Sequence, residues 1–284
     1  MPSLQALERS RHEIALVVTQ PDRPGHRLRL TPPPVKLAAE ELGLPVFQPE
    51  RIRSPENVNR LAQLAPELIV VVAYGQIIPP SLLALPPRGV VNVHASLLPR
   101  WRGAAPVAHA ILAGDRRTGV TIMQMDEQLD HGPILAARGT EIGDREDAVS
   151  LGERLAELGA ALLVETLARL DEIEPREQDH GAATHAPRLR REDGELGWEL
   201  AADDIDRRVR AFQPWPGVTL PLAGARVKVL RGRPGSGAGE PGRILGSGRD
   251  GVEVAAGRGS YVLEEVQPPG RRPLPARLLV AAGG

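Results

Sequence analysis

An uninterrupted apolar run at residues 68–73, Leu-Ile-Val-Val-Val-Ala, constrains the fold of this chain more than any other feature. Strands that are covered on both faces of a parallel sheet have such continuous apolar sequences, whereas strands with one solvated face alternate. Further strands are expected at residues 14–19, 46–47, 89–93 and 120–125, and helices at residues 34–42, 55–65, 106–113 and 147–170. The alternation of strands and helices predicts an α/β fold with a doubly wound, mostly parallel sheet.

Two of these helices carry specific signals. Ser54 stands directly before the helix that starts at Pro55, at the position where a hydroxyl caps the first free backbone N–H groups. The longest expected helix has leucines at a 4-3-4 spacing, which places them on one face: Leu151, Leu155, Leu158 and Leu162. That leucine face is expected to pack on the sheet.

The chain changes character after residue 171. Residues 171–191 are polar and irregular, and a helix at residues 205–212 follows them. Beyond it, short β-prone segments alternate with turns rich in Gly and Pro, a spacing that favours a small β-barrel: residues 226–230, 251–254 and 261–266. Residues 232–242 are rich in Gly, Pro and Ser, and we expect a long flexible hairpin loop there.

A chain of 284 residues is long enough for two modest cores. We therefore predict a first domain at residues 1–172, a linker at residues 173–192 and a second domain at residues 193–284.

The composition excludes several classes of protein. With no cysteine the chain has no disulfide, no thiol nucleophile and no thiolate metal site, and we expect no metal. No apolar stretch approaches the roughly 18 residues of a membrane span, and no signal peptide is visible, so a cytoplasmic, monomeric protein is expected. The formal net charge of -1 means that any contact with nucleic acid must come from local patches. Lys36 and Lys228 are the only lysines, so arginine dominates such patches.

The expected strand at residues 89–93 runs into a polar pair, Asn92 and His94. Side chains alternate along a strand, so these two point to the same face. Ligands bind at the carboxyl ends of strands in α/β sheets. The amide of Asn92 suits the stabilisation of an oxyanion, and the imidazole of His94 suits proton transfer near neutral pH. A strand end with two satisfied polar groups is the alternative interpretation.

Four separated motifs decide between these interpretations. They are residues 19–24 with 31–36, residues 96–106 (Ser-Leu-Leu-Pro-Arg-Trp-Arg-Gly-Ala-Ala-Pro), residues 119–133 and residues 205–217. In this order they resemble the folate-dependent formyltransferases, and most closely the branch that acts on methionyl-tRNA. The resemblance covers nearly the whole chain. It implies a Rossmann-like catalytic domain, an oligonucleotide-binding-type barrel, and transfer of the formyl group of 10-formyltetrahydrofolate to the α-amine of charged initiator tRNA.

The same resemblance assigns roles to individual residues. Asp130 joins Asn92 and His94 as a catalytic residue, either orienting His94 or passing a proton through water. The folate site is expected to be lined by Ser96, Leu97, Leu98, Pro99, Val72, Tyr74 and Gly75. Contacts with tRNA are expected from Arg23, His26, Arg27, Arg29, Arg207, Arg208 and Arg210. Trp101 has two interpretations, a nucleic-acid contact or a packed loop, whereas His109 is expected to be an ordinary helix residue and His131 a surface residue.

Two departures from the family pattern raise a further question. Family members open with an apolar strand and a Gly-containing turn, but this chain starts at Met1 directly on the helix around Pro2 to Leu7. The basic loop at residues 25–30 is also about one residue shorter than the usual pattern. We expect the native protein to begin upstream of Met1. The alternative is a truncated, catalytically impaired relative that binds tRNA or folate.

Overall fold

The computed structural model describes residues 1–24 and 30–281 and divides the chain into two compact units. The first unit comprises residues 1–103, 118–140 and 153–185, and the second comprises residues 104–117, 141–152 and 186–284. The second unit thus includes two short segments that interrupt the first unit in sequence. The expected division at residues 172 and 193 stays a prediction.

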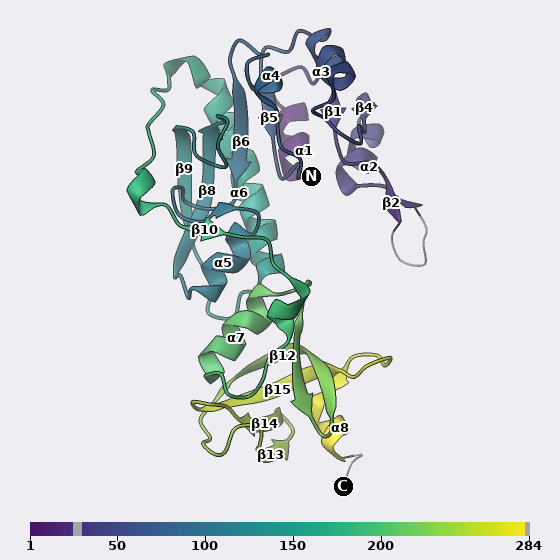
Figure 1. Ribbon diagram of the computed structural model, residues 1–284, viewed down its shortest axis with the longest axis vertical. Coiled ribbons are helices and arrows are strands. Elements are labelled where there is room, and N and C mark those ends of the chain that lie inside the picture. The colour runs from purple at the N-terminus through teal and green to yellow at the C-terminus, as the bar shows by residue number, and fades with distance from the viewer. Residues whose placement is uncertain (25–29, 282–284) are drawn as a thin grey trace. The chain divides into compact units, whose positions relative to one another are not determined.

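The first unit alternates short strands with helices, as the sequence predicts (Figure 1). Up to the middle of the sheet the elements are α1 (Pro2–Glu8), β1 (Val17–Val18), β2 (Arg23–Pro24), β3 (Leu30–Thr31), α2 (Pro34–Glu41), β4 (Val46–Phe47), α3 (Pro55–Ala62), β5 (Ile69–Val71), α4 (Pro80–Leu83) and β6 (Val90–His94). They continue with β7 (Arg102–Gly103), β8 (Arg117–Gln124), β9 (Ile134–Glu141) and α6 (Ala148–Ala168). Short 3-10 turns follow at Leu170–Glu172 and His180–Ala182, and β10 (His185–Ala186) comes after them.

The central sheet of this unit has the strand order β5-β6-β8-β9, and β1 forms a separate parallel pair with β4. β5 pairs with β6 in parallel, but β6 pairs with β8 in antiparallel fashion, with His94 opposite Thr121. The α/β class is therefore confirmed, with one strand direction reversed at β8. A strand buried on both faces has the same apolar sequence in either direction, so the sequence could not reveal this reversal.

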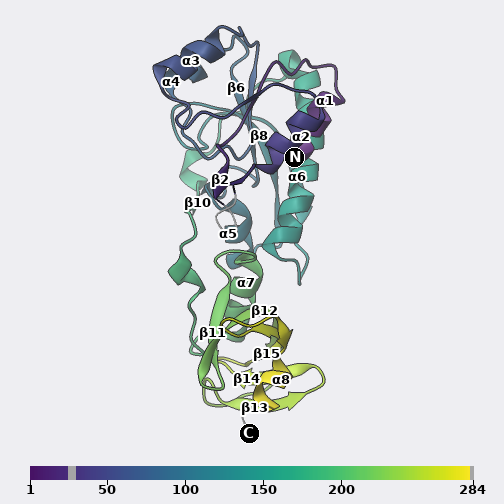
Figure 2. The same ribbon diagram turned by 90° about the vertical axis from the view of Figure 1, so that its right-hand side faces the viewer.

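Helix α6 packs closely on the sheet because a glycine faces it. A Cβ on Gly159 would lie 3.0 Å from Val93 Cγ1 and 3.2 Å from Val120 Cγ1. Figure 2 shows α6 running alongside β8. Three of the four expected leucines on this helix are buried: Leu151, Leu155 and Leu162.

Two local expectations in the first unit are wrong. The apolar run at residues 68–73 yields only a three-residue strand of intermediate burial, and Val72 beyond it is 42% exposed. Ala73 then adopts a left-handed backbone conformation with φ 46°, which ends the strand. Ser54 stands at the N-cap of α3 but makes no capping hydrogen bond, because its hydroxyl contacts Glu56 instead.

The second unit contains an antiparallel sheet with helices packed on it. Its helices are α5 (Pro106–Leu112), α7 (Ala202–Ala211) and α8 (Ala276–Ala281), with a 3-10 turn at Arg191–Gly194. Its strands are β11 (Val218–Leu222), β12 (Ala225–Gly235), β13 (Ile244–Gly248), β14 (Gly251–Ala255), β15 (Ser260–Gln267) and β16 (Leu274–Pro275). The pairing order is β11-β12-β15-β14-β13, with β16 on β15, and α7 contacts both β12 and β15. The antiparallel second domain is confirmed, and closure into a barrel stays a prediction.

The expected hairpin loop at residues 232–242 is wrong in its first part. Strand β12 continues to Gly235 and pairs with β15 along this stretch. Gly232 is needed there because an added Cβ would lie 2.5 Å from Tyr261 Cε1 and 2.7 Å from the Val262 carbonyl oxygen. The glycines that suggested a loop instead allow close packing between two strands.

The segment predicted as a linker begins as part of the first unit. Arg176 and Ile134 exchange two backbone hydrogen bonds, of 2.7 and 2.9 Å. Gln178 is only 5% exposed. The first half of this segment is therefore packed against the sheet, although its composition is that of a linker.

We predict that Gly119→Ala destabilises the fold. A Cβ at this position in β8 would lie 2.2 Å from the Arg138 carbonyl oxygen and 2.9 Å from Gly139 Cα, and backbone atoms cannot give way cheaply. The expected loss is about 1–3 kcal/mol in the free energy of unfolding, measured by urea denaturation. Gly152→Ala is the matched control, because a Cβ there meets nothing within 4 Å inside α6. It should raise stability by up to about 1 kcal/mol. Equal stability of Gly119→Ala and the unsubstituted protein would contradict this packing.

Candidate active site

Asn92 and His94 are the last polar residues of β6 and are almost completely buried, at 8% and 6% exposed. The strand is a central one, paired with β5 on one edge and β8 on the other. Both side chains point to the same face, as the two-residue period predicts. Their positions are therefore fixed by a hydrogen-bonded ladder on each side.

Asp130 brings its carboxylate to both of these side chains. Its Oδ1 accepts a hydrogen bond of 3.4 Å from Asn92 Nδ2 and lies 3.6 Å from His94 Nδ1. Its Oδ2 accepts a hydrogen bond of 2.8 Å from the backbone N–H of Gly103. The three residues expected to be catalytic therefore lie together, with Asn92 and His94 both at the Asp130 carboxylate. Asn92 and His94 come from β6, whereas Asp130 lies in a turn 36 residues beyond the end of that strand.

Two residues of this site have a left-handed backbone. Asp130 has φ 49° and Trp101 has φ 62°. This conformation costs an L-residue about 1–2 kcal/mol, and aspartate tolerates it better than tryptophan does. Such residues are concentrated at functional sites, where the surrounding contacts hold them. Here the Trp101 N–H donates to Thr184 Oγ1 at 2.9 Å, which fixes the turn.

The Trp101 turn sets the orientation of the His94 ring. His94 Nε2 lies 2.9 Å from the Trp101 carbonyl oxygen. A carbonyl oxygen only accepts, so Nε2 must carry the proton that is donated in this hydrogen bond. Nδ1, which faces Asp130, is then the ring nitrogen that is left to take up or release a proton.

Buried and partly exposed side chains alternate along the segment of Ser96, Leu97, Leu98 and Pro99. Ser96 is fully buried, and its hydroxyl donates to the Arg100 carbonyl oxygen at 2.5 Å. Leu98 is 6% exposed, belongs to a cluster with Met123 and Ile134, and donates its N–H to Thr121 Oγ1. Ser96 and Leu98 therefore hold the segment from within, and the expectation that this segment lines the folate site stays a prediction. Leu97 and Pro99 are partly exposed and remain available for that role.

The other expected folate residues follow β5. Val72 and Gly75 are exposed, and Gly75 has φ 79°, which favours glycine. Tyr74 differs, because its ring packs against the cluster of Ile52, Leu61 and Leu82. Burial raises the pKa of its phenol, and its hydroxyl has no hydrogen-bond partner within residues 1–24 and 30–281. Tyr74 is thus a core residue on its ring side.

Three side chains near the site make contacts that the sequence does not predict. His131 was expected to be a plain surface residue, but its Nδ1 lies 2.6 Å from Asp126 Oδ2 and its ring stacks on His180 at 3.9 Å. The Trp101 ring lies against the guanidinium of Arg100, 4.4 Å from its Cζ, and both interpretations of Trp101 stay predictions. Gln178, which the sequence analysis missed, donates to the carbonyl oxygen of Asp130.

The basic loop expected to contact tRNA is only partly described. Arg23 is exposed and donates to Gln20 Oε1 at 3.1 Å, whereas His26, Arg27 and Arg29 lie outside the described residues. Just before the loop, Asp22 pairs with Lys36 at 2.8 Å. The hydrogen bond from Gln48 and then that from Lys36 lower the pKa of the Asp22 carboxyl. The ion pair between Asp22 and Lys36 connects the start of the loop to α2.

The three arginines of α7 are engaged within the second unit. Arg207 pairs with Asp204, and Arg208 donates to the Asp204 carbonyl oxygen at 3.3 Å. Arg210 is 18% exposed, donates to Asp206 Oδ2 at 2.7 Å and also donates to the Glu146 carbonyl oxygen. Arg210 therefore has a structural role within the second unit, and its expected contact with RNA phosphate stays a prediction.

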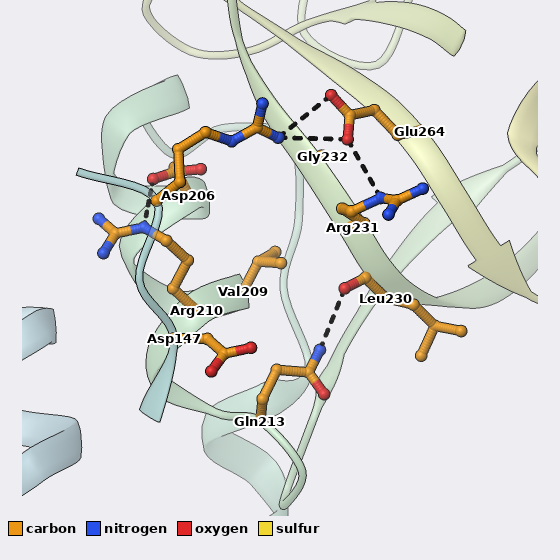
Figure 3. A pocket seen from close by; sticks show the side chains of 10 residues that line it. Asp147, Asp206, Val209, Arg210, Gln213, Leu230, Arg231, Gly232 and Glu264 are labelled. Carbon is orange, nitrogen blue, oxygen red and sulfur yellow. Dashed lines mark hydrogen bonds and ion pairs between the residues drawn. The ribbon is translucent and has the colours of Figure 1, made fainter. Parts of the chain in front are cut away.

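A cavity of about 350 Å³ lies beside Arg210 in the second unit (Figure 3). Its wall carries the guanidinium groups of Arg145, Arg210 and Arg231 and the carboxylates of Asp147, Asp206 and Glu264. Arg145 and Arg231 both pair with Glu264, at 3.2 and 3.4 Å. The charges of these three guanidinium groups and three carboxylates sum to zero, so the lining of this cavity does not favour an anion.

Within residues 1–24 and 30–281 no group of three or more His, Asp or Glu side chains is arranged to hold a metal ion. Across the same residues, no helix is both long and apolar enough to span a membrane.

Comparison with known proteins assigns the family. Residues 2–167 match the formyl transferase family model, and residues 188–282 match the model of the formyl transferase C-terminal domain. A methionyl-tRNA formyltransferase of Citrifermentans bemidjiense is 49% identical over 97% of this chain and 87% of its own length. One from Thermus thermophilus is 50% identical over 97% of this chain and 90% of its own. The chain belongs to the methionyl-tRNA formyltransferase family. The predicted family and its enzyme class, a one-carbon group transferase, are confirmed.

Solved structures support the fold of this formyltransferase. HypX from Aquifex aeolicus in complex with tetrahydrofolic acid matches with a TM-score of 0.64 at 20% identity, over 87% of this chain and 44% of that one. An N-formyltransferase from Helicobacter canadensis, in complex with folinic acid and dTDP-3-aminofucose, matches with a TM-score of 0.69 at 14% identity, over 94% of each chain. At these identities the likeness shows the fold alone.

Proposed function

We propose that this chain transfers the formyl group from N10 of 10-formyltetrahydrofolate to the α-amine of methionyl-initiator tRNA. Membership in the methionyl-tRNA formyltransferase family supports the reaction. The convergence of Asn92 and His94 on the Asp130 carboxylate is the single observation that carries the proposed site. The complete set of polar groups also argues against a catalytically impaired relative, the alternative that the sequence left open.

The chemistry requires charge stabilisation at one oxygen. The amine attacks the formyl carbon, and the carbonyl oxygen becomes an oxyanion as the new C–N bond forms. Asn92 has two N–H groups on its amide, of which one donates to Asp130. The second is the donor we assign to the oxyanion. Loss of one such donor typically costs on the order of 2.7–4 kcal/mol of transition-state stabilisation.

Proton movement falls to His94 and Asp130. The attacking amine must lose a proton, and N10 must gain one as its bond to the formyl carbon breaks. Nε2 of His94 holds its proton against the Trp101 carbonyl, so we assign the exchange to Nδ1. Asp130 lies 3.6 Å from that nitrogen and stabilises the positive charge that the ring acquires.

We assign the folate cosubstrate to the surface formed by Leu97, Pro99, Val72 and Gly75. Partly exposed apolar side chains and the backbone of two turns suit the flat pterin ring. Buried Ser96 and Leu98 keep one turn in place from behind.

We assign tRNA recognition to the loop with Arg23, His26, Arg27 and Arg29, and to the domain at residues 193–284. Loop arginines reach the unpaired acceptor end, and Arg207 and Arg208 lie at the start of this second domain. We further propose that the protein acts as a monomer in the cytoplasm, where charged tRNA and folate are available.

Asn92→Ala, His94→Ala and Asp130→Ala should each lower turnover by at least about a hundredfold, because each group acts in the transition state. Affinity for methionyl-tRNA should change little. Steady-state formylation assays and a filter-binding titration measure the two quantities. His109→Ala is the control, since the ring of this α5 histidine contacts the Pro187 carbonyl oxygen at 3.1 Å, and about twofold is the largest loss expected. Near-normal turnover of any of the three variants would remove that residue from the mechanism.

Replacing Arg27 and Arg29 together by alanine should weaken the reaction with methionyl-tRNA and leave folate binding intact. Arginines on phosphates release counterions, so the salt dependence of tRNA affinity should become shallower, by a slope of about 0.7–0.9 per lost contact. Titrations at several salt concentrations measure that slope. Unchanged kinetics with charged initiator tRNA would show that this loop does not recognise RNA.

A further inference from the structure

Gln178 occupies a buried position directly behind the Asp130 turn. Its Nε2 donates to the carbonyl oxygens of Asp130, at 3.0 Å, and Gly132, at 2.7 Å. Its Oε1 accepts from Arg102 Nε at 3.1 Å and Arg102 Nη2 at 2.7 Å. An amide has two N–H donors and two acceptor lone pairs, so every hydrogen-bonding position of this side chain is used.

The chemistry of its partners fixes which way the amide faces. The guanidinium of Arg102 only donates, and the two backbone carbonyls only accept. Oxygen must therefore face Arg102, and nitrogen must face the turn. Only a neutral amide satisfies both sides, because a carboxylate would present an oxygen to two carbonyl oxygens.

Arg102 connects the same amide to the other side of the Asp130 carboxylate. It is 6% exposed and also donates through Nη2 to His180 Nδ1 at 2.9 Å. The next residue, Gly103, donates the N–H that holds Asp130 Oδ2. Gln178 thus links the backbone that carries Asp130 to the strand β7 that binds its carboxylate.

A second close contact restricts the same turn. A Cβ on Gly132 would lie 2.1 Å from the Gln124 carbonyl oxygen, so the backbone passes close to β8 there. The two hydrogen bonds from Gln178 restrain the backbone of this turn, in which Asp130 has its left-handed conformation.

We propose that Gln178 is a positioning residue for formyl transfer, which acts by fixing the Asp130 carboxylate against Asn92 and His94 through the pair with Arg102. This inference rests on the proposed catalytic role of Asp130. A displacement of a reacting group by about 1 Å costs on the order of a hundredfold in rate. The amide side chain therefore contributes to turnover without touching either substrate.

Gln178→Glu tests the proposal with an isosteric change. The carboxylate keeps the pair with Arg102 but loses both hydrogen bonds to the turn. We expect kcat to fall at least tenfold, while KM for methionyl-tRNA stays close to that of the unsubstituted protein. The melting temperature should also fall, because a buried carboxylate then faces two carbonyl oxygens, but the variant should remain folded at the assay temperature. Asn57→Asp is the matched control: its Nδ2 also donates to a backbone carbonyl oxygen, that of Arg51, but it lies on α3, to which no substrate is assigned. Its kcat should stay within about twofold.

A double-mutant cycle separates positioning from general stability. If Gln178 acts through Asp130, adding Gln178→Glu to Asp130→Asn should lower kcat less than about twofold further. The proposal would be overturned if the double variant lost kcat by the product of the two single losses. A normal kcat for Gln178→Glu alone would overturn it as well. A normal kcat for Asp130→Asn alone would instead overturn the proposed catalytic role of Asp130. Should Gln178→Glu fail to fold, Gln178→Asn serves in the same cycle, since the shorter amide reaches only one of its two sets of partners.

Discussion

The carboxylate of Asp130 is the contact on which the organisation of the site depends. It joins three pieces of chain: the end of β6 with Asn92 and His94, the short strand β7 with Gly103, and its own turn before β9. None of these pieces is adjacent in sequence, so the contact closes long loops at a cost in chain entropy. The sheet, the close packing at Gly132 and the amide of Gln178 hold this arrangement together.

The backbone strain of the site follows from the same requirement. Trp101 must adopt a left-handed conformation for its carbonyl to meet His94 Nε2, and Asp130 must do so for its carboxylate to reach β6 and Gly103. Thr184 and Gln178 supply hydrogen bonds to these two turns, and both come from residues 173–185. That polar segment therefore has a structural role at the site, although its composition is that of a linker.

The sequence was sufficient for features that depend on local periodicity or on a motif. The two-residue period gave the shared face of Asn92 and His94, and the apolar runs gave the α/β class. Features that depend on distant partners could not be predicted. The reversed direction of β8, the buried ring of Tyr74 and the hydrogen bond from Arg210 to the Glu146 carbonyl oxygen require knowledge of what each residue faces. Gln178 is the extreme case, because a glutamine between polar residues has no local signal of burial.

The most direct test of this arrangement is the protonation of His94, observed by NMR with ¹⁵N-labelled histidine. Its signals are assigned by comparison with His94→Gln. Because the Trp101 carbonyl accepts from Nε2, we predict that the neutral ring carries its proton on Nε2 and that Nδ1 is unprotonated. An Nδ1-protonated neutral ring, with Nε2 unprotonated, would contradict the assignment of Nδ1 as the proton-exchanging atom and with it the proposed role of Asp130.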